Sequence, residues 1–216
     1  TVETKTGATT KTAGAVTVGF EEVEAANTIE VKSGMTGALA LSKITDATVN
    51  LGAASAMTAS TITTDLGVKT LTINATGEDS DFRLTAAAVE TLTIAAAADL
   101  DISTGSTLTK LATATITGAG DVNLGDLSAS ASFATLNASA AKGDITAEIT
   151  ATNTAVTTGS GNDDVTVNQN VKYTVDLGEG TNKLTIASAV ATDGGSFTTG
   201  SGDDTIELQN TAANVI

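Results

Sequence analysis

The sequence predicts an all-β fold, a parallel β-helix or β-roll solenoid with about 21 residues per coil. Short aliphatic–polar–aliphatic triplets recur at nearly constant spacing along most of the 216 residues. Threonine and other β-branched residues are abundant and proline is absent, so each inner strand keeps its backbone N–H donor. Aromatic residues make up only 2% of the chain, which favours a thin core of small aliphatic side chains over a thick globular one.

The repeat predicts two strands per coil. The first strands begin at Val49, Leu71, Leu92, Ala114, Leu136, Val156, Val175 and Phe197. The second strands follow after a turn and begin at Phe82, Leu100, Val122, Ile145, Val165, Leu184 and Ile206. Alternation within each triplet is typical of a strand with one buried face. An outward polar column is expected at Arg83, Asp101, Asn123, Thr146, Thr166, Thr185 and Glu207.

The chain is predicted to form one elongated domain, 1–216, because no linker interrupts it. Residues 1–45 are less regular: 16–18 and 29–31 resemble strands, and 20–27 is expected to be a loop or a helical turn. Alanine runs such as 95–98 favour helix but are too short to outweigh the surrounding threonines. Because the chain begins at Thr1 in mid-pattern, we expect a fragment whose secretion signal and cell anchor lie elsewhere in a larger protein.

The composition excludes several functions. Ten basic against 25 acidic side chains give a net charge of −15, which argues against nucleic acid and favours divalent cations as partners. The absence of His and Cys removes catalytic triads and thiolate nucleophiles, and we expect no enzyme. No apolar run approaches the roughly 20 residues that a transmembrane helix needs.

A glycine-rich phrase near the end predicts cation sites. Residues 159–165 (GSGNDDV) recur as 200–206 (GSGDDTI), with a weaker copy, GEGTNKL, at 178–184. The spacing of the copies is about one coil, so Asp163, Asn182 and Asp204 should stack along one edge. Carboxylates and turn carbonyls are the oxygen ligands that Ca²⁺ prefers. The candidate metal residues are Gly159, Gly161, Asn162, Asp163, Asp164, Gly178, Gly180, Asn182, Gly200, Gly202, Asp203 and Asp204. The earlier turn residues Asp79, Asp81 and Asp121 are expected to be solvated.

These phrases resemble the calcium-binding nonapeptide of RTX proteins, G-G-x-G-x-D-x-U-x. The resemblance implies that Asp163 and Asp204 are calcium-ligating aspartates, followed by the aliphatics Val165 and Ile206. Thr158 and Thr199 replace the first glycine, and the middle copy carries Leu177 and Asn182 instead of the first glycine and the aspartate. One or two calcium sites are therefore expected rather than a full ladder.

The sequence pattern over the rest of the chain, with phrases such as VETLTI at 89–94, is similar to that of surface-layer (S-layer) proteins and large RTX adhesins of Gram-negative bacteria. That similarity implies a secreted, extracellular, calcium-stabilised protein that forms a homo-oligomer or lattice on the cell surface. Anchoring to a cell-surface polysaccharide would use regions outside this chain. The alternative is a stalk or ligand-binding segment of an RTX adhesin.

A more remote alternative is ice binding by a threonine column. Its members are Thr72, Thr93, Thr115, Asn137, Thr157, Asp176 and Thr198. The column is expected to be one threonine wide and to be interrupted by Asn137 and Asp176.

Overall fold

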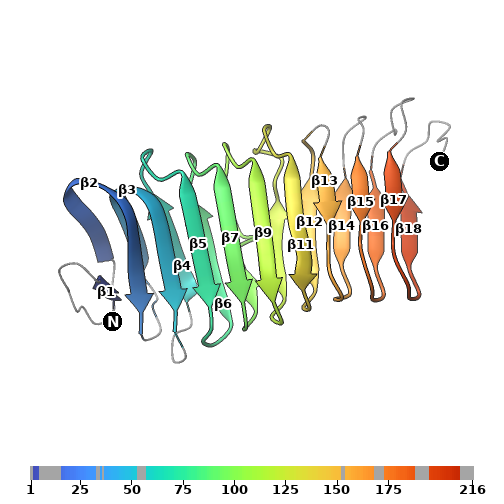
Figure 1. The fold of residues 1–216 in the computed structure, drawn as a ribbon, viewed down its shortest axis with the longest axis horizontal. Helices are drawn as coiled ribbons and strands as arrows, with labels where there is room; N and C mark the ends of the chain where they lie inside the picture. The colour runs from blue at the N-terminus through green and yellow to red at the C-terminus, as the bar shows by residue number, and fades with distance from the viewer. Residues whose placement is uncertain are drawn as a thin grey trace.

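The computed structural model describes residues 2–4, 16–32, 35, 37–52, 57–151, 154–167, 173–187 and 195–209. These residues form 18 strands and no helix, and the strands stack into an elongated solenoid (Figure 1). All strand pairings of the described part are parallel except that of β1 with β2. The predicted all-β parallel solenoid is therefore confirmed.

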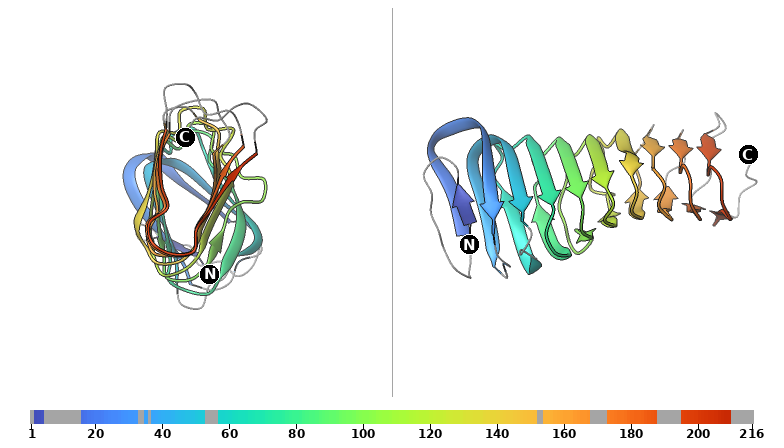
Figure 2. Two further views of the ribbon diagram at one scale, coloured as in Figure 1. Left: turned by 90° about the vertical axis from the view of Figure 1, so that its right-hand side faces the viewer. Right: turned by 60° about the horizontal axis from the view of Figure 1, so that its bottom comes forward.

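Each coil contributes one strand to each of two walls, and Figure 2 (left) shows these walls as the long sides of a flattened ring. The first wall contains β5 (Thr70–Ala75), β7 (Thr91–Ala96), β9 (Thr113–Gly118), β11 (Thr135–Ala141), β13 (Ala155–Thr157), β15 (Thr174–Asp176) and β17 (Ser196–Thr198). The second contains β4 (Thr58–Thr64), β6 (Ser80–Thr85), β8 (Leu100–Asp101), β10 (Val122–Asp126), β12 (Ile145–Ile149), β14 (Asp164–Val167), β16 (Lys183–Ile186) and β18 (Thr205–Leu208).

The first wall has nearly the predicted register. Leu71 pairs with Leu92, and Leu92 pairs with Ala114, so these coils have the expected length. The first predicted step is wrong by two residues, because Val49 pairs with Ile73 and Ala47 pairs with Leu71. A shift of two keeps every side chain on its own face, so the alternating pattern alone does not reveal it.

The second wall differs from the prediction in the same way, and here the difference matters. Leu100 pairs with Ser80 rather than with Phe82, and Ala147 rather than Ile145 pairs with Val165. The inward column through Leu100, Val122 and Ile145 consequently continues into the glycine-rich turns. The outward column runs through Asp81, Asp101, Asn123, Thr146, Asp164, Lys183 and Thr205. The predicted column aligned Asp101, Asn123 and Thr146 with Arg83 on one side and with Thr166, Thr185 and Glu207 on the other, and both alignments are wrong by two residues, although Thr166, Thr185 and Glu207 are in register with one another.

The N-terminal strands are longer than expected and curve around both walls (Figure 1). β1 (Val2–Thr4) pairs with β2 (Val16–Val31), which pairs with β3 (Ala38–Leu51). β3 pairs with β4 through residues 38–41 and with β5 through residues 46–51. The loop or helical turn expected at 20–27 is wrong, because this segment belongs to β2, whose pairing with β3 shifts register between Gly19 and Glu24.

Inward side chains fill the space between the walls. Leu71, Ile73, Leu92 and Ile94 are fully buried, as their alternation predicts. The few aromatic residues are used in the same way, since Phe82 and Phe133 are also buried in this core. Each coil buries its aliphatics against its neighbours, so the coils depend on stacking for stability.

Candidate calcium site in the glycine-rich turns

The turns that join β13 to β14, β15 to β16 and β17 to β18 stack on one another through glycines. A Cβ added to Gly178 would lie 2.1 Å from the Gly159 carbonyl oxygen, and one added to Gly180 would lie 2.1 Å from the Gly161 carbonyl oxygen. Gly178 and Gly180 also have positive φ angles of 68° and 120°. Only glycine can occupy these two positions, because a side chain would clash with the preceding turn and because the φ angles are positive. The backbones of successive turns are therefore closely stacked.

Asp163, Asn182 and Asp204 stack in successive coils, as predicted. Oδ1 of Asp163 accepts a hydrogen bond from the Ile145 amide at 2.8 Å. In the same way, Asn182 Oδ1 accepts from the Asp163 amide at 3.0 Å, and Asp204 Oδ1 accepts from the Asn182 amide at 2.9 Å. We call these three residues the inner ladder. Each side chain replaces an aliphatic of the earlier coils and binds the backbone of the coil before it.

The second carboxylate oxygen of Asp163 is the unusual group of this site. Asp163 is 1% exposed, and its Oδ2 has no hydrogen-bond partner among the described residues. The Thr158 hydroxyl lies beside the carboxyl, but it donates to the Leu177 carbonyl at 2.8 Å. Burial raises the pKa of Asp163 above its ordinary 3.8, the nearby Asp144 charge adds to the rise, and the contacts with Thr158 and Ile145 oppose it.

The other predicted ligands are distributed differently. Asn182 uses Oδ1 for the Asp163 amide and donates from Nδ2 to the Thr199 carbonyl at 3.0 Å, which leaves its side chain poorly suited to a cation. Asp164 faces outward, with an oxygen 3.8 Å from Lys183 Nζ. Asp203 is exposed. The structure therefore separates Asp164 and Asp203 from the buried oxygen of Asp163.

A second ladder of Asp and Asn side chains was missed at the sequence level. Its hydrogen bonds run the opposite way, because each side chain accepts from an amide of the following coil. Asp121 Oδ1 accepts from the Asp144 amide at 2.7 Å, and Asp144 Oδ1 accepts from the Asn162 amide at 2.6 Å. This outer ladder comprises Asp79, Asp99, Asp121, Asp144 and Asn162. The available signal was an aspartate immediately before the first aliphatic of the second strand, as at Asp99, Asp121 and Asp144.

The outer ladder borders a groove of about 540 Å³ on the second wall. Carboxylates dominate its lining, which includes Asp79, Asp81, Asp99, Asp101, Asp121 and Asp144. In the part of the chain that the structure describes, however, no three His, Cys, Asp or Glu side chains converge closely enough to hold a metal ion. Asp79 and Asp121 are exposed, and each accepts a hydrogen bond from a backbone amide of the next coil.

Asp163 offers calcium the type of ligand atom that it prefers, a carboxylate oxygen, although no cage of several carboxylates from the described part of the chain surrounds the position. The fit rests on the buried, unpartnered Oδ2 of Asp163, while the backbone carbonyls of the glycine turns stack in the same part of the solenoid and that of Gly159 already accepts a hydrogen bond from the Glu179 amide at 2.9 Å. Ca²⁺ accepts carboxylate and backbone carbonyl oxygens together. A cation at Asp163 would neutralise a charge that burial otherwise disfavours.

Fold and site together define a parallel β-solenoid with stacked glycine–Asx turns. Comparison of the chain with protein-family models, with curated proteins and with solved structures finds no match. Among the described residues there is also no helix long and apolar enough to cross a membrane.

Proposed function

We propose that this chain is a structural segment of a secreted bacterial surface-layer protein, stabilised by calcium and assembled into a lattice on the cell surface. The observation that carries the calcium part is the unpartnered, buried Oδ2 of Asp163. The surface-layer part is supported by the resemblance of the turns to RTX repeats and by the similarity of the rest of the sequence pattern to S-layer proteins.

Calcium would stabilise the C-terminal coils by relieving the buried charge. Asp163 and the glycine carbonyls of the stacked turns would hold the ion, and Asp204 lies two coils along the same ladder. A ligand that binds only the folded chain shifts the folding equilibrium in proportion to its concentration. Export into calcium-rich medium would thereby favour the folded rod over the unfolded chain.

The role proposed is not catalytic. The chain has no His or Cys, and the ladder carboxylates are engaged with backbone amides through Oδ1. Such hydrogen bonds hold neighbouring coils together, which suits a load-carrying rod.

Calcium binding is tested by isothermal titration of the chelator-treated protein. We expect wild-type protein to bind calcium, Asp163→Asn to lose most of the affinity, and Asp164→Asn to keep it. Asp164 is the matched control because it is the sequence neighbour that faces outward. Equal titration curves for the two variants would contradict the site, and a flat wild-type curve would contradict calcium altogether.

Assembly is tested separately by light scattering and electron microscopy during the calcium titration. A surface-layer segment is expected to form ordered sheets as calcium is added. Rods that bind calcium but remain monomeric would instead support the stalk of an RTX adhesin.

A further inference from the structure

The outward face of the first wall is two threonines wide, not one. Thr70 and Thr72 of β5 are in register with Thr91 and Thr93 of β7, and these are in register with the corresponding pair of β9. The uninterrupted set from β5 to β11 comprises Thr70, Thr72, Thr91, Thr93, Thr113, Thr115 and Thr135, which we call the threonine face. The expectation of a single column was therefore wrong, because it omitted the threonine that precedes each first aliphatic.

The threonine face is a regular two-dimensional grid. Adjacent parallel strands are spaced by about 4.8 Å, and alternate residues of one strand are about 6.6 Å apart. β-Branched side chains have restricted χ1 angles, so few arrangements of methyl group and hydroxyl are open to each threonine of a stacked column. The grid consequently presents methyl groups and hydroxyls at a regular spacing.

The hydroxyls of this grid are free. All seven side chains are partly exposed, and the structure gives their hydroxyls no hydrogen bond to any described residue. By comparison, the nearby Thr109 hydroxyl donates to the Ala87 carbonyl at 2.9 Å. Seven oriented donor and acceptor groups are therefore available to an external partner.

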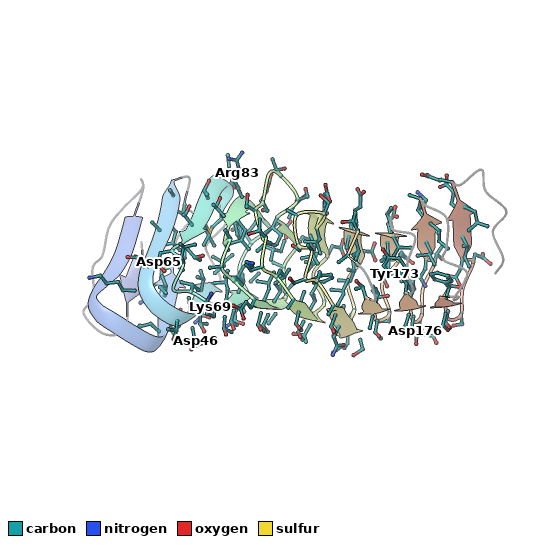
Figure 3. All side chains as sticks on the ribbon, turned by 90° about the horizontal axis from the view of Figure 1, so that it is seen from above. Asp46, Asp65, Lys69, Arg83, Tyr173 and Asp176 are labelled. Atoms are coloured by element: carbon teal, nitrogen blue, oxygen red, sulfur yellow. The ribbon has the colours of Figure 1, made fainter. Side chains whose placement is uncertain are left out.

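Charge is excluded from the same face. Strands β5, β7, β9, β11 and β13 contain no charged residue, although the chain has a net charge of −15. Asp46 and Asp176 lie on this side near the two ends, with Arg83 on the opposite side (Figure 3). At the edge, Lys69 and Glu90 form an ion pair at 3.3 Å. The acidic side chains gather instead along the groove of the second wall.

We propose that the threonine face binds ice. Ice presents hydrogen-bond donors and acceptors on its surface in a regular two-dimensional array, which a regular grid of free hydroxyls can meet without leaving those groups unpaired. Every threonine hydroxyl could then stay hydrogen-bonded while its methyl group packs against the lattice. A second copy of the chain fits this face less well, because it would bury hydroxyls against groups not placed to pair with them, and such unpaired groups are costly.

The proposal does not depend on the lattice function, and it is tested on the full chain in calcium-containing buffer by thermal hysteresis and ice-crystal morphology. Wild-type protein is expected to depress the freezing point below the melting point and to shape ice crystals. Thr93→Lys places a charge at the centre of the grid and should abolish both effects. Thr115→Lys repeats the substitution in the next coil.

The matched control is Thr146→Lys, an outward position on the second wall that is expected to leave both effects unchanged. Circular dichroism checks that all three variants are folded. Absence of hysteresis and of crystal shaping in the wild-type protein would overturn the proposal, as would equal loss in Thr93→Lys and Thr146→Lys. A dimer in sedimentation velocity that Thr93→Lys alone dissociates would also overturn it, because the face would then be an interface between copies.

Discussion

Replacing Asp163 by asparagine should have opposite effects with and without calcium. Asparagine keeps an oxygen to accept the Ile145 amide and removes the charge from the unpartnered position. The asparagine amide nitrogen that replaces Oδ2 is neutral, and a buried charge left unpaired costs more than an unpaired neutral group, by an amount on the order of the 1–3 kcal/mol that one unsatisfied buried group costs. In chelator, therefore, Asp163→Asn should be more stable than wild-type protein.

The size of the effect is measurable by thermal melting. For a chain of this length, each kcal/mol shifts Tm by roughly 2–4 °C, so the variant should melt about 2–12 °C higher in chelator. Calcium at a hundredfold excess over Kd adds about 2.7 kcal/mol to a protein that binds it. Wild-type protein should gain this stability and the variant should not, so the difference in Tm closes or reverses.

The assay is melting followed by circular dichroism, with Asp164→Asn as the control. Asp164 is partly exposed and lies 3.8 Å from Lys183, and surface pairs of this kind contribute about 0–1 kcal/mol. Its replacement should change Tm little in either buffer. The reasoning is refuted if Asp163→Asn melts at or below wild-type protein in chelator and calcium shifts both by the same amount.

Three further predictions concern pH, the turns and the core. Burial raises the folded-state pKa of Asp163 above 3.8, so the protonated side chain stabilises the folded protein at low pH, and this stability is lost as pH rises through the folded pKa. In chelator, Tm should therefore fall as pH rises over this range. Asp163→Asn should make Tm depend less on pH. Gly180→Ala should lower the free energy of unfolding, measured in urea, by about 1–3 kcal/mol, because the added Cβ would lie 2.1 Å from the Gly161 carbonyl oxygen. The control Gly52→Ala should be tolerated, because the nearest atom to its Cβ would lie 3.5 Å away. Leu92→Ala should cost about 2–5 kcal/mol in the same measurement, because Leu92 is fully buried between coils; a change below 1 kcal/mol would contradict its place in the core.

The period of the solenoid could be predicted from the sequence because every coil buries side chains at the same positions, so aliphatic triplets recur once per strand. The sequence did not predict register to better than two residues, because a shift of two preserves the alternation. For this reason the burial of Asp163 was not predicted. With Val165 aligned to Ile145, Asp163 is aligned with Gly143, whereas in the structure Asp163 itself follows Ile145 in the buried column.

The candidate site was predictable in outline and not in detail. The glycine spacing correctly stacked Asp163, Asn182 and Asp204, since all three copies share it. Hydrogen bonding decides which oxygens remain free, and that depends on the relative position of neighbouring coils. The second column of the threonine face, by contrast, follows from the predicted register of Leu71, Leu92 and Ala114, which the structure confirms, because a threonine precedes each of them.

A crystal structure of the calcium-loaded protein, with anomalous data to locate calcium, tests the central claim most directly. The account predicts a calcium peak about 2.3–2.6 Å from Oδ2 of Asp163, with backbone carbonyls of the stacked glycine turns completing part of its shell. An Asp163 carboxyl that remains buried in calcium with no anomalous peak beside it would contradict the account.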